Sequence, residues 1–470
     1  MIRLATVFSG IGAVEHALDR LKIPHEIVFA CDNGERKLKT SYDAIMAETK
    51  SMSNIERDRY VSNLYDKECG INYVEQEYKA NYHIESDRFF QDVKLLDGKE
   101  FKEQVDLFVG GSPCQSFSVM GKQGGLEEAR GTLFYEYARL VEEIQPKVFI
   151  YENVTGMLKH DKGRTWEVVS GIFDTLGYSW KCWELNAKDF GLPQNRRRIF
   201  VVGFRKDCKS FFDHIMDPQK IKLKMEMSAL LEDVVDNKYY LPEKGFKRAI
   251  DPNQKKHVAL NGTISRCQVA CQQYNWFGDM RFESDIPKRL EDDDRIYKGE
   301  YNGQRGVARC LTPRECLRLM GYEDTFDIAV PDTQMYRQCG NSIAVNVMME
   351  VVRQINLTGV FREETEQVPL QIATVFSGIG APEFALKRLG IEHDIVFACD
   401  NGEIDLTKPD EEVLEDLKKI PTLEERKAYV KTLIPVRRTN SVKKSYLANY
   451  DMDEDHYYHN VRFLEGDEYK

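Results

Sequence analysis

Two side chains that could carry out covalent chemistry each come directly after a short apolar run. Cys114 lies in the segment GGSPCQSFS that follows residues 105–109, and Glu152 follows residues 147–151. Such runs are typical of buried strands, and α/β sheets place reactive groups in loops at the carboxyl ends of parallel strands. A thiol beside a carboxylic acid can act as a nucleophile paired with a proton donor. On its own Cys114 would more often be a small buried side chain, but the acid on a neighbouring strand favours catalysis.

A glycine turn between two further apolar runs predicts a nucleoside site. Residues 4–8 are apolar, Ser9-Gly10-Ile11-Gly12 follows, and residues 13–21 are amphipathic. A second apolar run ends in Asp32, where Rossmann-like folds place the carboxylate that binds a ribose. Because the third glycine of the dinucleotide fingerprint is missing, the pattern favours a nucleoside cofactor without a pyrophosphate. A strand, turn and helix without any ligand is the alternative for this segment alone.

The alternation of apolar runs with amphipathic stretches predicts the elements that position these groups. We expect an α/β fold whose mixed, mostly parallel sheet is covered by helices on both faces. A catalytic and cofactor-binding domain would span residues 1–205, and residues 309–356 would return to it. Between these segments the alternation stops, and residues 206–308 are expected to form a smaller domain.

An internal repeat organises the rest of the chain. Residues 4–35 (copy one) and 372–403 (copy two) are identical at 25 of 32 positions, at an offset of 368. Residues 357–371 are expected to be a linker, and residues 372–470 a partial copy of the cofactor-binding region. Copy two carries Asn460 where copy one has Asp92, and it contains no counterpart of the PCQ segment, so we expect no catalysis from it alone. A second polypeptide could complete it, it could be a remnant of duplication, or it could replace copy one in the sheet.

The composition is that of a globular protein from a reducing compartment. Hydrophobic residues make up 42% and charged residues 30% of the chain. No apolar run reaches the roughly 18 residues that a membrane span needs. Eleven cysteines without a CxxC pair indicate reduced thiols and a cytoplasmic location, and we expect no metal site and no membrane partner.

The formal net charge of -11 at first argues against a nucleic-acid partner. Residues 357–470 contain 15 basic and 23 acidic residues, which leaves 51 basic and 54 acidic residues in the first 356. A nearly neutral charge in residues 1–356 is compatible with a nucleic-acid partner, because phosphates respond to the local potential.

Seven sequence blocks in a fixed order resemble one enzyme family. The blocks are FSGIGA (8–13), SPCQSFS (112–118), RGTLF (130–134), ENV (152–154), QNRRR (194–198), RCLTPRE (309–315) and GNSI (340–343). With these blocks the chain is similar to the DNA (cytosine-5)-methyltransferases that use S-adenosylmethionine. The resemblance implies a Rossmann-like S-adenosylmethionine-dependent methyltransferase fold, with residues 206–308 as the target-recognition domain and double-stranded DNA as the partner.

The same resemblance implies the catalytic roles. Cys114 would attack C6 of a flipped-out cytosine, and Glu152 would act at N3 of the ring. Arg198 would hold the ring and the thiolate, while Arg196 would hold a phosphate of the target strand. Gln194 opens the same block and is counted with the catalytic residues. The segment 112–131 would be a mobile loop that closes over the base.

The cofactor residues are carried over in the same way. Asp32 would bind the ribose hydroxyls and Asp92 the adenine amino group. A helix N-cap is the alternative role for Asn341. The complete set of expected S-adenosylmethionine contacts is Phe8, Gly10, Gly12, Asp32, Asp92, Pro113, Leu133, Asn341 and Ser342.

Two other functions fit the same blocks. A tRNA cytosine-5 methyltransferase shares the fold, but Gln115 and the size of region 206–308 favour DNA. A catalytically silent nucleic-acid-binding homologue is the other, but Cys114, Glu152 and Arg198 are all present. In a bacterial or phage restriction-modification system, a cognate restriction endonuclease would be the genetic partner.

Overall fold

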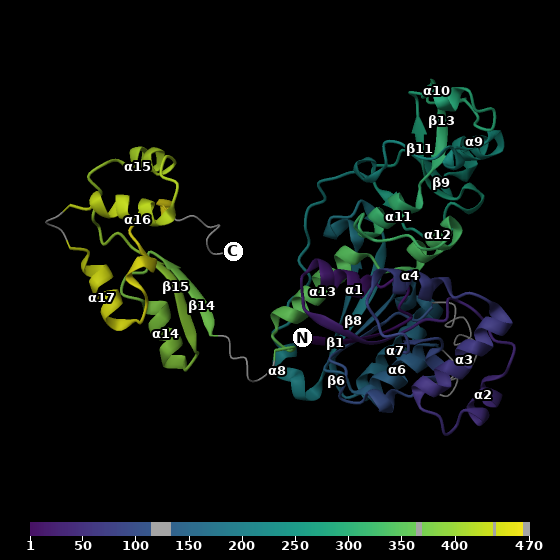
Figure 1. Cartoon of the computed structure of the whole chain (residues 1–470), viewed down its shortest axis with the longest axis horizontal. Coiled ribbons are helices and arrows are strands. Elements are labelled where there is room, and N and C mark those ends of the chain that lie inside the picture. The colour runs from purple at the N-terminus through teal and green to yellow at the C-terminus, as the bar shows by residue number, and fades with distance from the viewer. Residues whose placement is uncertain (114–132, 363–368, 436–438, 464–470) are drawn as a thin grey trace. The chain divides into compact units, whose positions relative to one another are not determined.

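The computed structural model describes residues 1–113, 133–362, 369–435 and 439–463 (Figure 1). The chain divides into two compact units, residues 1–361 and residues 362–470. None of the helices in the described ranges is long and apolar enough to cross a membrane.

A seven-stranded sheet forms the centre of the first unit, in the order β3-β2-β1-β4-β5-β8-β6. Within this sheet β8 alone runs antiparallel to its neighbours, so the expected mixed, mostly parallel sheet is confirmed. The carboxyl ends of the parallel strands therefore lie along one edge. The strands are β1 (Ile2–Val7), β2 (His25–Cys31), β3 (Phe89–Phe90), β4 (Leu107–Gly110), β5 (Val148–Val154), β6 (Tyr178–Asn186) and β8 (Arg197–Arg205).

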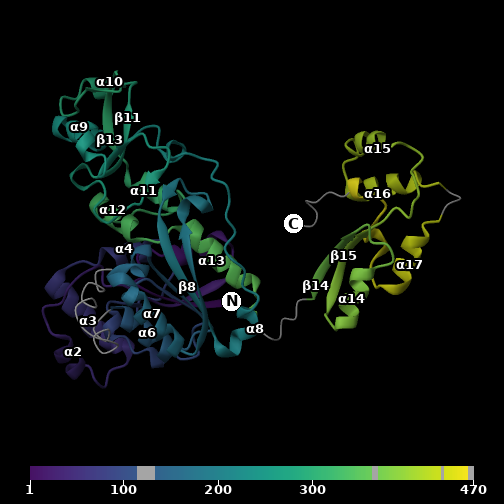
Figure 2. The ribbon, with the colours of Figure 1, turned by 180° about the vertical axis from the view of Figure 1, so that it is seen from behind.

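Helices cover both faces of this sheet, as expected (Figures 1 and 2). Because successive side chains of a strand point to opposite faces, Leu107 and Val109 belong to the core shared with α1 and α13, whereas Phe108 stacks on Tyr137 of α6. The helices are α1 (Ala13–Arg20), α2 (Tyr42–Glu48), α3 (Asn54–Cys69), α4 (Tyr73–Asn81), α6 (Leu133–Ile144), α7 (Arg164–Thr175), α8 (Lys209–Phe212), α11 (Pro313–Met320), α12 (Asp332–Asn341) and α13 (Val345–Leu357).

A second, four-stranded sheet lies within the expected recognition region, in the order β12-β13-β11-β9. It has a separate apolar core around Phe246, Met280 and Phe282. Strand β13 runs through the expected boundary at 308/309, so the chain leaves this small sheet only after Cys310. The elements are α9 (Glu243–Ile250), β9 (Val258–Leu260), β11 (Gly278–Glu283), α10 (Lys288–Glu291), β12 (Gly299–Tyr301) and β13 (Gln304–Cys310), and a short parallel pair joins β7 (Gln194–Asn195) to β10 (Ser265–Arg266).

The second unit repeats the beginning of the first. Three parallel strands form its sheet, in the order β14-β15-β16. Its described elements are β14 (Leu370–Val375), α14 (Ala381–Leu389), β15 (His393–Cys399), α15 (Asp410–Leu417), α16 (Leu423–Thr432), α17 (Ser441–Asn449) and β16 (Tyr457–Tyr458).

Candidate active site

The segment that leads to Cys114 is anchored to β5. The Ser112 hydroxyl lies 2.7 Å from the Tyr151 hydroxyl, and Asn153 Nδ2 donates to the Ser112 carbonyl at 2.9 Å. Cys114 itself, and the rest of the segment 112–131 that is expected to close over the base, lie outside the described residues. Asn153, which sequence reasoning quoted only as part of a motif, thus anchors Ser112, two residues before Cys114.

Glu152 lies inside strand β5 and not after it. The strand continues to Val154 because it pairs with β8 as far as the pair Val154↔Arg198. This register brings Arg198 Nε to 3.1 Å from Glu152 Oε1. Burial raises the pKa of Glu152, and the charges of Arg198 and Arg196 oppose this shift only in part.

The Glu152 carboxyl group lies between Gly111 and the Arg198 guanidinium. A Cβ atom on Gly111 would lie 2.9 Å from the Glu152 carbonyl oxygen and 3.0 Å from Oε2, so only glycine fits there. Oε1 is buried and forms an ion pair with Arg198 Nε at 3.1 Å, and no well-aligned hydrogen-bond donor to it is found among the described residues. The carboxyl group therefore has Arg198 as its charged neighbour and keeps the capacity for a further hydrogen bond.

Region 206–308 contributes Cys267 to this site. Both terminal nitrogens of Arg198 lie 3.8 Å from Cys267 Sγ, and Arg196 Nη1 lies 3.5 Å from it. Sequence reasoning missed this neighbour, because nothing in region 206–308 indicates which segment returns to the sheet edge. Beside Cys267 opens a pocket of about 180 Å³, whose lining includes Lys256, His257, Arg266, Gln272 and Gln273.

Arg196 does not have the surroundings expected of a phosphate ligand. The side chain is buried, with Nη1 donating to the Gln268 carbonyl at 2.8 Å and Nη2 to the Ser342 carbonyl at 2.6 Å. Burial lowers its pKa to about 10. The expected phosphate contact stays a prediction, and in the structure the guanidinium joins the segment around Gln268 to the end of α12.

Gln194 likewise connects the segment around Gln268 to a helix of the first unit, α11. Its Oε1 accepts from the Gln268 amide at 3.0 Å, and its Nε2 donates to the Leu319 carbonyl at 2.9 Å. The side chain is fully buried. In this geometry Gln194 positions the segment that carries Cys267.

The glycine turn is held by Asp32. The Gly10 amide donates to Asp32 Oδ2 at 3.0 Å and the Gly34 amide to Oδ1 at 2.8 Å. A carboxylate oxygen can accept two hydrogen bonds, so each oxygen keeps a position for a ribose hydroxyl. Burial raises the pKa of Asp32, and the two amides oppose this shift. Phe8 precedes the turn with φ of 54°, a left-handed conformation.

Substituting Gly12 with Ala should destabilise the protein more than substituting Gly10. Both glycines have left-handed φ, 71° and 56°, which costs a non-glycine residue about 1–2 kcal/mol. A Cβ on Gly12 would also lie 2.1 Å from the Tyr82 ring, whereas a Cβ on Gly10 would meet no atom within 4 Å. Overpacking adds about 1–3 kcal/mol. Thermal unfolding of the two variants measures the difference, and equal transition temperatures would contradict the clash.

Asp92 is engaged by two tyrosines that sequence reasoning did not identify. Tyr42 of α2 and Tyr65 of α3 donate to Asp92 Oδ2 at 2.8 and 2.5 Å, and the Lys94 amide donates to Oδ1. Burial, together with the Asp92 charge, raises the pKa of both tyrosines, so they remain donors. Asp92 lies after β3, at the edge where the parallel strands end.

The remaining expected cofactor residues lie around the same edge. Asn341 is the last residue of α12, which excludes the N-cap alternative, and its Nδ2 donates to Glu35 Oε1 at 2.7 Å. Ser342 is buried, and its hydroxyl lies 2.8 Å from the Tyr322 hydroxyl. Pro113 follows β4, and Leu133 begins α6.

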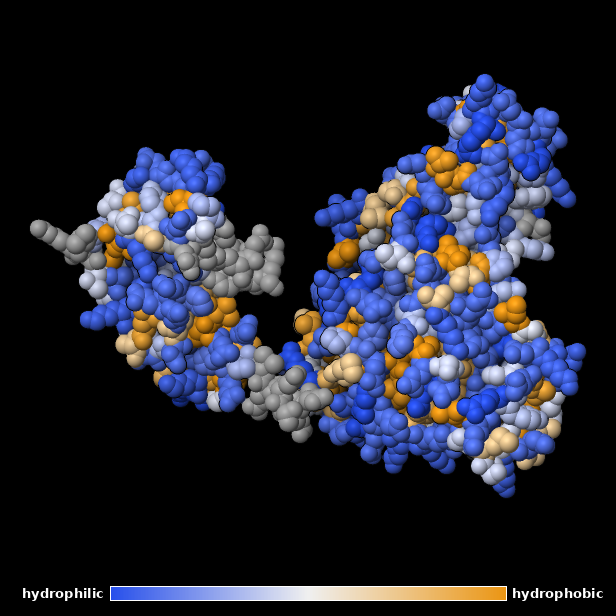
Figure 3. Space-filling model, in the orientation of Figure 1, coloured by the Kyte–Doolittle hydropathy of each residue, from blue (hydrophilic) through white to orange (hydrophobic). Residues whose placement is uncertain are grey.

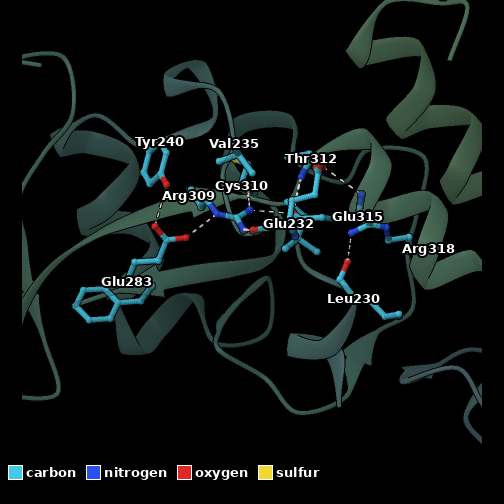
Figure 4. Close-up of polar contacts among 12 residues, drawn as sticks. Leu230, Glu232, Val235, Tyr240, Glu283, Arg309, Cys310, Thr312, Glu315 and Arg318 are labelled. Atoms are coloured by element: carbon cyan, nitrogen blue, oxygen red, sulfur yellow. Dashed lines mark hydrogen bonds and ion pairs between the residues drawn. The ribbon is translucent and has the colours of Figure 1, made fainter. Parts of the chain in front are cut away.

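A buried ionic cluster connects the small sheet to the main unit (Figure 4). Arg309, at the end of β13, is 1% exposed. Its guanidinium donates to both carboxylate oxygens of Glu315 in α11, at 2.8 and 2.9 Å, and to Glu283 in β11 at 2.8 Å. Burial lowers the pKa of Arg309, but the two carboxylates outweigh it and the net shift is upward.

Comparisons with known proteins agree with this geometry. A model of the C-5 cytosine-specific DNA methylase family matches residues 49–357. The Type II methyltransferase M1.ScrFI of Lactococcus lactis subsp. cremoris is 35% identical over 59% of this chain and 68% of its own length. M.HpaII of Haemophilus parainfluenzae is 33% identical over 60% of this chain and 80% of its own.

Among solved structures, the Dnmt2 methyltransferase of S. pombe superposes with a TM-score of 0.51 at 18% identity, over 76% of this chain and 98% of that one. The structural likeness supports the methyltransferase fold, and the sequence matches carry the family. The chain belongs to the C-5 cytosine-specific DNA methylases, and it is a DNA (cytosine-5) methyltransferase.

Proposed function

We propose that this enzyme methylates a cytosine flipped out of duplex DNA through a covalent bond between Cys114 Sγ and C6 of the ring. Cytosine C5 is a weak nucleophile, and addition of a thiolate at C6 makes it an enamine carbon. The addition moves electron density towards N3 and O2 of the ring. Removing the base from the stack costs a few kcal/mol, which contacts to the closed site must repay.

The single observation that carries this proposal is the state of Glu152. It is buried, its pKa is raised, and its Oε1 has no well-aligned hydrogen-bond donor in the described part of the chain. A protonated Glu152 can donate to N3 as the negative charge develops there. Arg198, whose Nε lies 3.1 Å from Oε1 of the same carboxyl group, would stabilise charge on O2 and on the thiolate.

S-adenosylmethionine is the proposed cofactor, and it supplies an electrophilic methyl group when bound. Asp32 would hold the ribose through its two remaining acceptor positions, and Asp92 would accept from the adenine amino group. Phe8, Gly10 and Gly12 form the turn beside these carboxylates. After methylation a water molecule takes up the C5 proton, the C5–H electron pair re-forms the C5=C6 double bond, and the Cys114–C6 bond breaks to release the thiolate, while the N3 proton returns to Glu152.

Transfer of a labelled methyl group to duplex DNA and to tRNA tests the proposal. We expect incorporation into duplex DNA and none above background into tRNA, with complete loss in Cys114→Ser. DNA with 5-fluorocytosine at target sites should stay attached to the wild-type protein, because fluorine cannot leave as the C5 proton does. Transfer to tRNA alone, or full activity of Cys114→Ser, would contradict the proposal.

The setting proposed for the enzyme is a restriction-modification system of a bacterium or phage. Relatives such as M1.ScrFI and M.HpaII are named Type II methyltransferases. A cognate restriction endonuclease would then be the genetic partner, and the protein would act in the cytoplasm. Methylation-sensitive sequencing of host DNA that carries the gene should show modified cytosines at one short sequence, and random modification would contradict a restriction role.

A further inference from the structure

Copy two reproduces the local structure of copy one. Strands β14 and β15 pair with the same register shift, at Ile372/Ala373, that β1 and β2 show at Leu4/Ala5. The Tyr450 hydroxyl donates to the Gly380 carbonyl at 2.6 Å, as Tyr82 donates to Gly12 at 2.7 Å. The repeated sequence therefore forms the repeated fold, with the same turn and the same supporting contacts.

The cofactor chemistry has changed in copy two. Asn460 stands in the position of Asp92 and donates from Nδ2 to Asp410 Oδ2 at 3.0 Å. In copy one, the residue at the position of Asp410 is Tyr42, which donates to Asp92 at 2.8 Å. The hydrogen-bond acceptor at position 92 is thus a donor at position 460, and the donor at position 42 is an acceptor at position 410. Copy two therefore lacks the carboxylate that is expected to accept a hydrogen bond from adenine.

The apolar face that copy one buries is exposed in copy two. In copy one, β4 pairs with β1 and helix α13 packs on α1, so Ile2 is 3% and Ile11 1% exposed. Among the described residues of copy two, β14 is an edge strand, and the matching residues Leu370 and Ile379 are 50% and 70% exposed. Figure 3 shows hydrophobic side chains at the surface over β14 and α14. The exposed apolar residues on the α14 side are Leu370, Ile379, Phe384, Leu389 and Ile391, whereas Val375 and Phe376 belong to the opposite side of the sheet, as Val7 and Phe8 do in copy one.

The exposed area of this face and its unprotected edge strand, β14, are those of a protein–protein interface. Its five side chains expose roughly 600 Å², so two copies would bury about 1,200 Å², the lower limit for a specific, stable interface. Monomeric proteins often protect edge strands with proline or charged residues. Strand β14 contains neither. An apolar face beside an unprotected edge is typical of an association surface.

The sequence of β14 favours a second copy of this chain as the partner, and not a separate polypeptide that supplies a strand equivalent to β4. In copy one, Arg3 joins β1 to Asp106, just before β4, with Nε and Nη2 each 3.0 Å from a carboxylate oxygen. Copy two has Gln371 at this position and cannot form that ion pair. Two neutral, apolar β14 edges are complementary to each other when they run antiparallel about a two-fold axis.

We propose that two copies of this chain associate through this face, with their β14 strands paired antiparallel, so that copy two serves as an association module. Sedimentation velocity of the full chain over a range of concentrations tests this. We expect wild type to reach the mass of two chains as concentration rises. Ile379→Glu should weaken association at least ten-fold and leave thermal unfolding unchanged, because the side chain is already exposed.

The matched control is Ile71→Glu, the same change at another isoleucine, 62% exposed and in the first unit. It should associate like wild type. A wild-type chain that keeps the mass of one chain at every concentration would overturn the proposal, and so would an Ile379→Glu variant that associates like wild type. A single-chain mass is also the outcome expected if a β4-bearing polypeptide were the true occupant. Because sedimentation needs no substrate, the result is independent of the proposed methylation mechanism.

Discussion

Replacing Glu152 with Gln is expected to lower kcat for methyl transfer to duplex DNA by a factor of about 10² to 10⁴, the contribution typical of a positioned general acid. Gln keeps the shape of the side chain and a hydrogen-bond donor, but it cannot give a proton to N3. The raised pKa of Glu152 adds a second expectation. Activity of wild type should fall as pH rises, because the acid loses its proton, and this decline should be absent from the residual activity of Glu152→Gln.

Single-turnover methyl transfer across a range of pH measures both effects. Glu142→Gln, on the exposed side of α6, is the matched control and should keep wild-type kcat and pH profile. Thermal unfolding should show that Glu152→Gln is folded, since the substitution removes a buried group whose charged form is disfavoured. A variant with wild-type kcat would exclude Glu152 as the acid.

The sequence predicts the parts of this site that depend on local pattern. The apolar runs before Ser9, Cys114 and Glu152 predict strands, and parallel strands bring their carboxyl ends to one edge without further information. For this reason the turn at Gly10 and Gly12 and the carboxylate of Asp32 could be placed correctly relative to each other, and the structure joins them by hydrogen bonds.

Contacts that depend on sheet order and on long-range packing could not be predicted. Arg198 meets Glu152 because β8 pairs antiparallel with β5, which no periodicity reveals. Arg196 has the residue type of a phosphate ligand, and only the approach of Gln268 and Ser342 shows that its guanidinium is used within the protein. Tyr42 and Tyr65 reach Asp92 from helices whose packing cannot be inferred from composition.

Replacing Arg309 with Met is expected to destabilise the first unit by about 3–5 kcal/mol, the cost of breaking a buried ion pair from one side. Arg309 is the shared partner of Glu283 and Glu315, and Glu315 is fully buried. Without the guanidinium, a buried carboxylate loses its compensating charge, and the small sheet loses its connection to α11. Urea denaturation and methyl transfer at low temperature measure the two consequences, lower stability and weaker use of DNA.

Arg305→Met is the matched control, because Arg305 lies on the same strand and pairs with Glu291 at the surface. Exposed ion pairs contribute about 0–1 kcal/mol, so this variant should unfold close to wild type. Arg309→Lys should fall between the two, since an ammonium group retains the charge but cannot give Glu315 two parallel hydrogen bonds. If Arg309→Met were as stable as Arg305→Met, the cluster would not be what holds the small sheet. The positions of Cys267 near Arg198 and of Gln268 near Gln194 would then depend on other contacts, such as those of Gln268 with Arg196, Gln194 and Cys316.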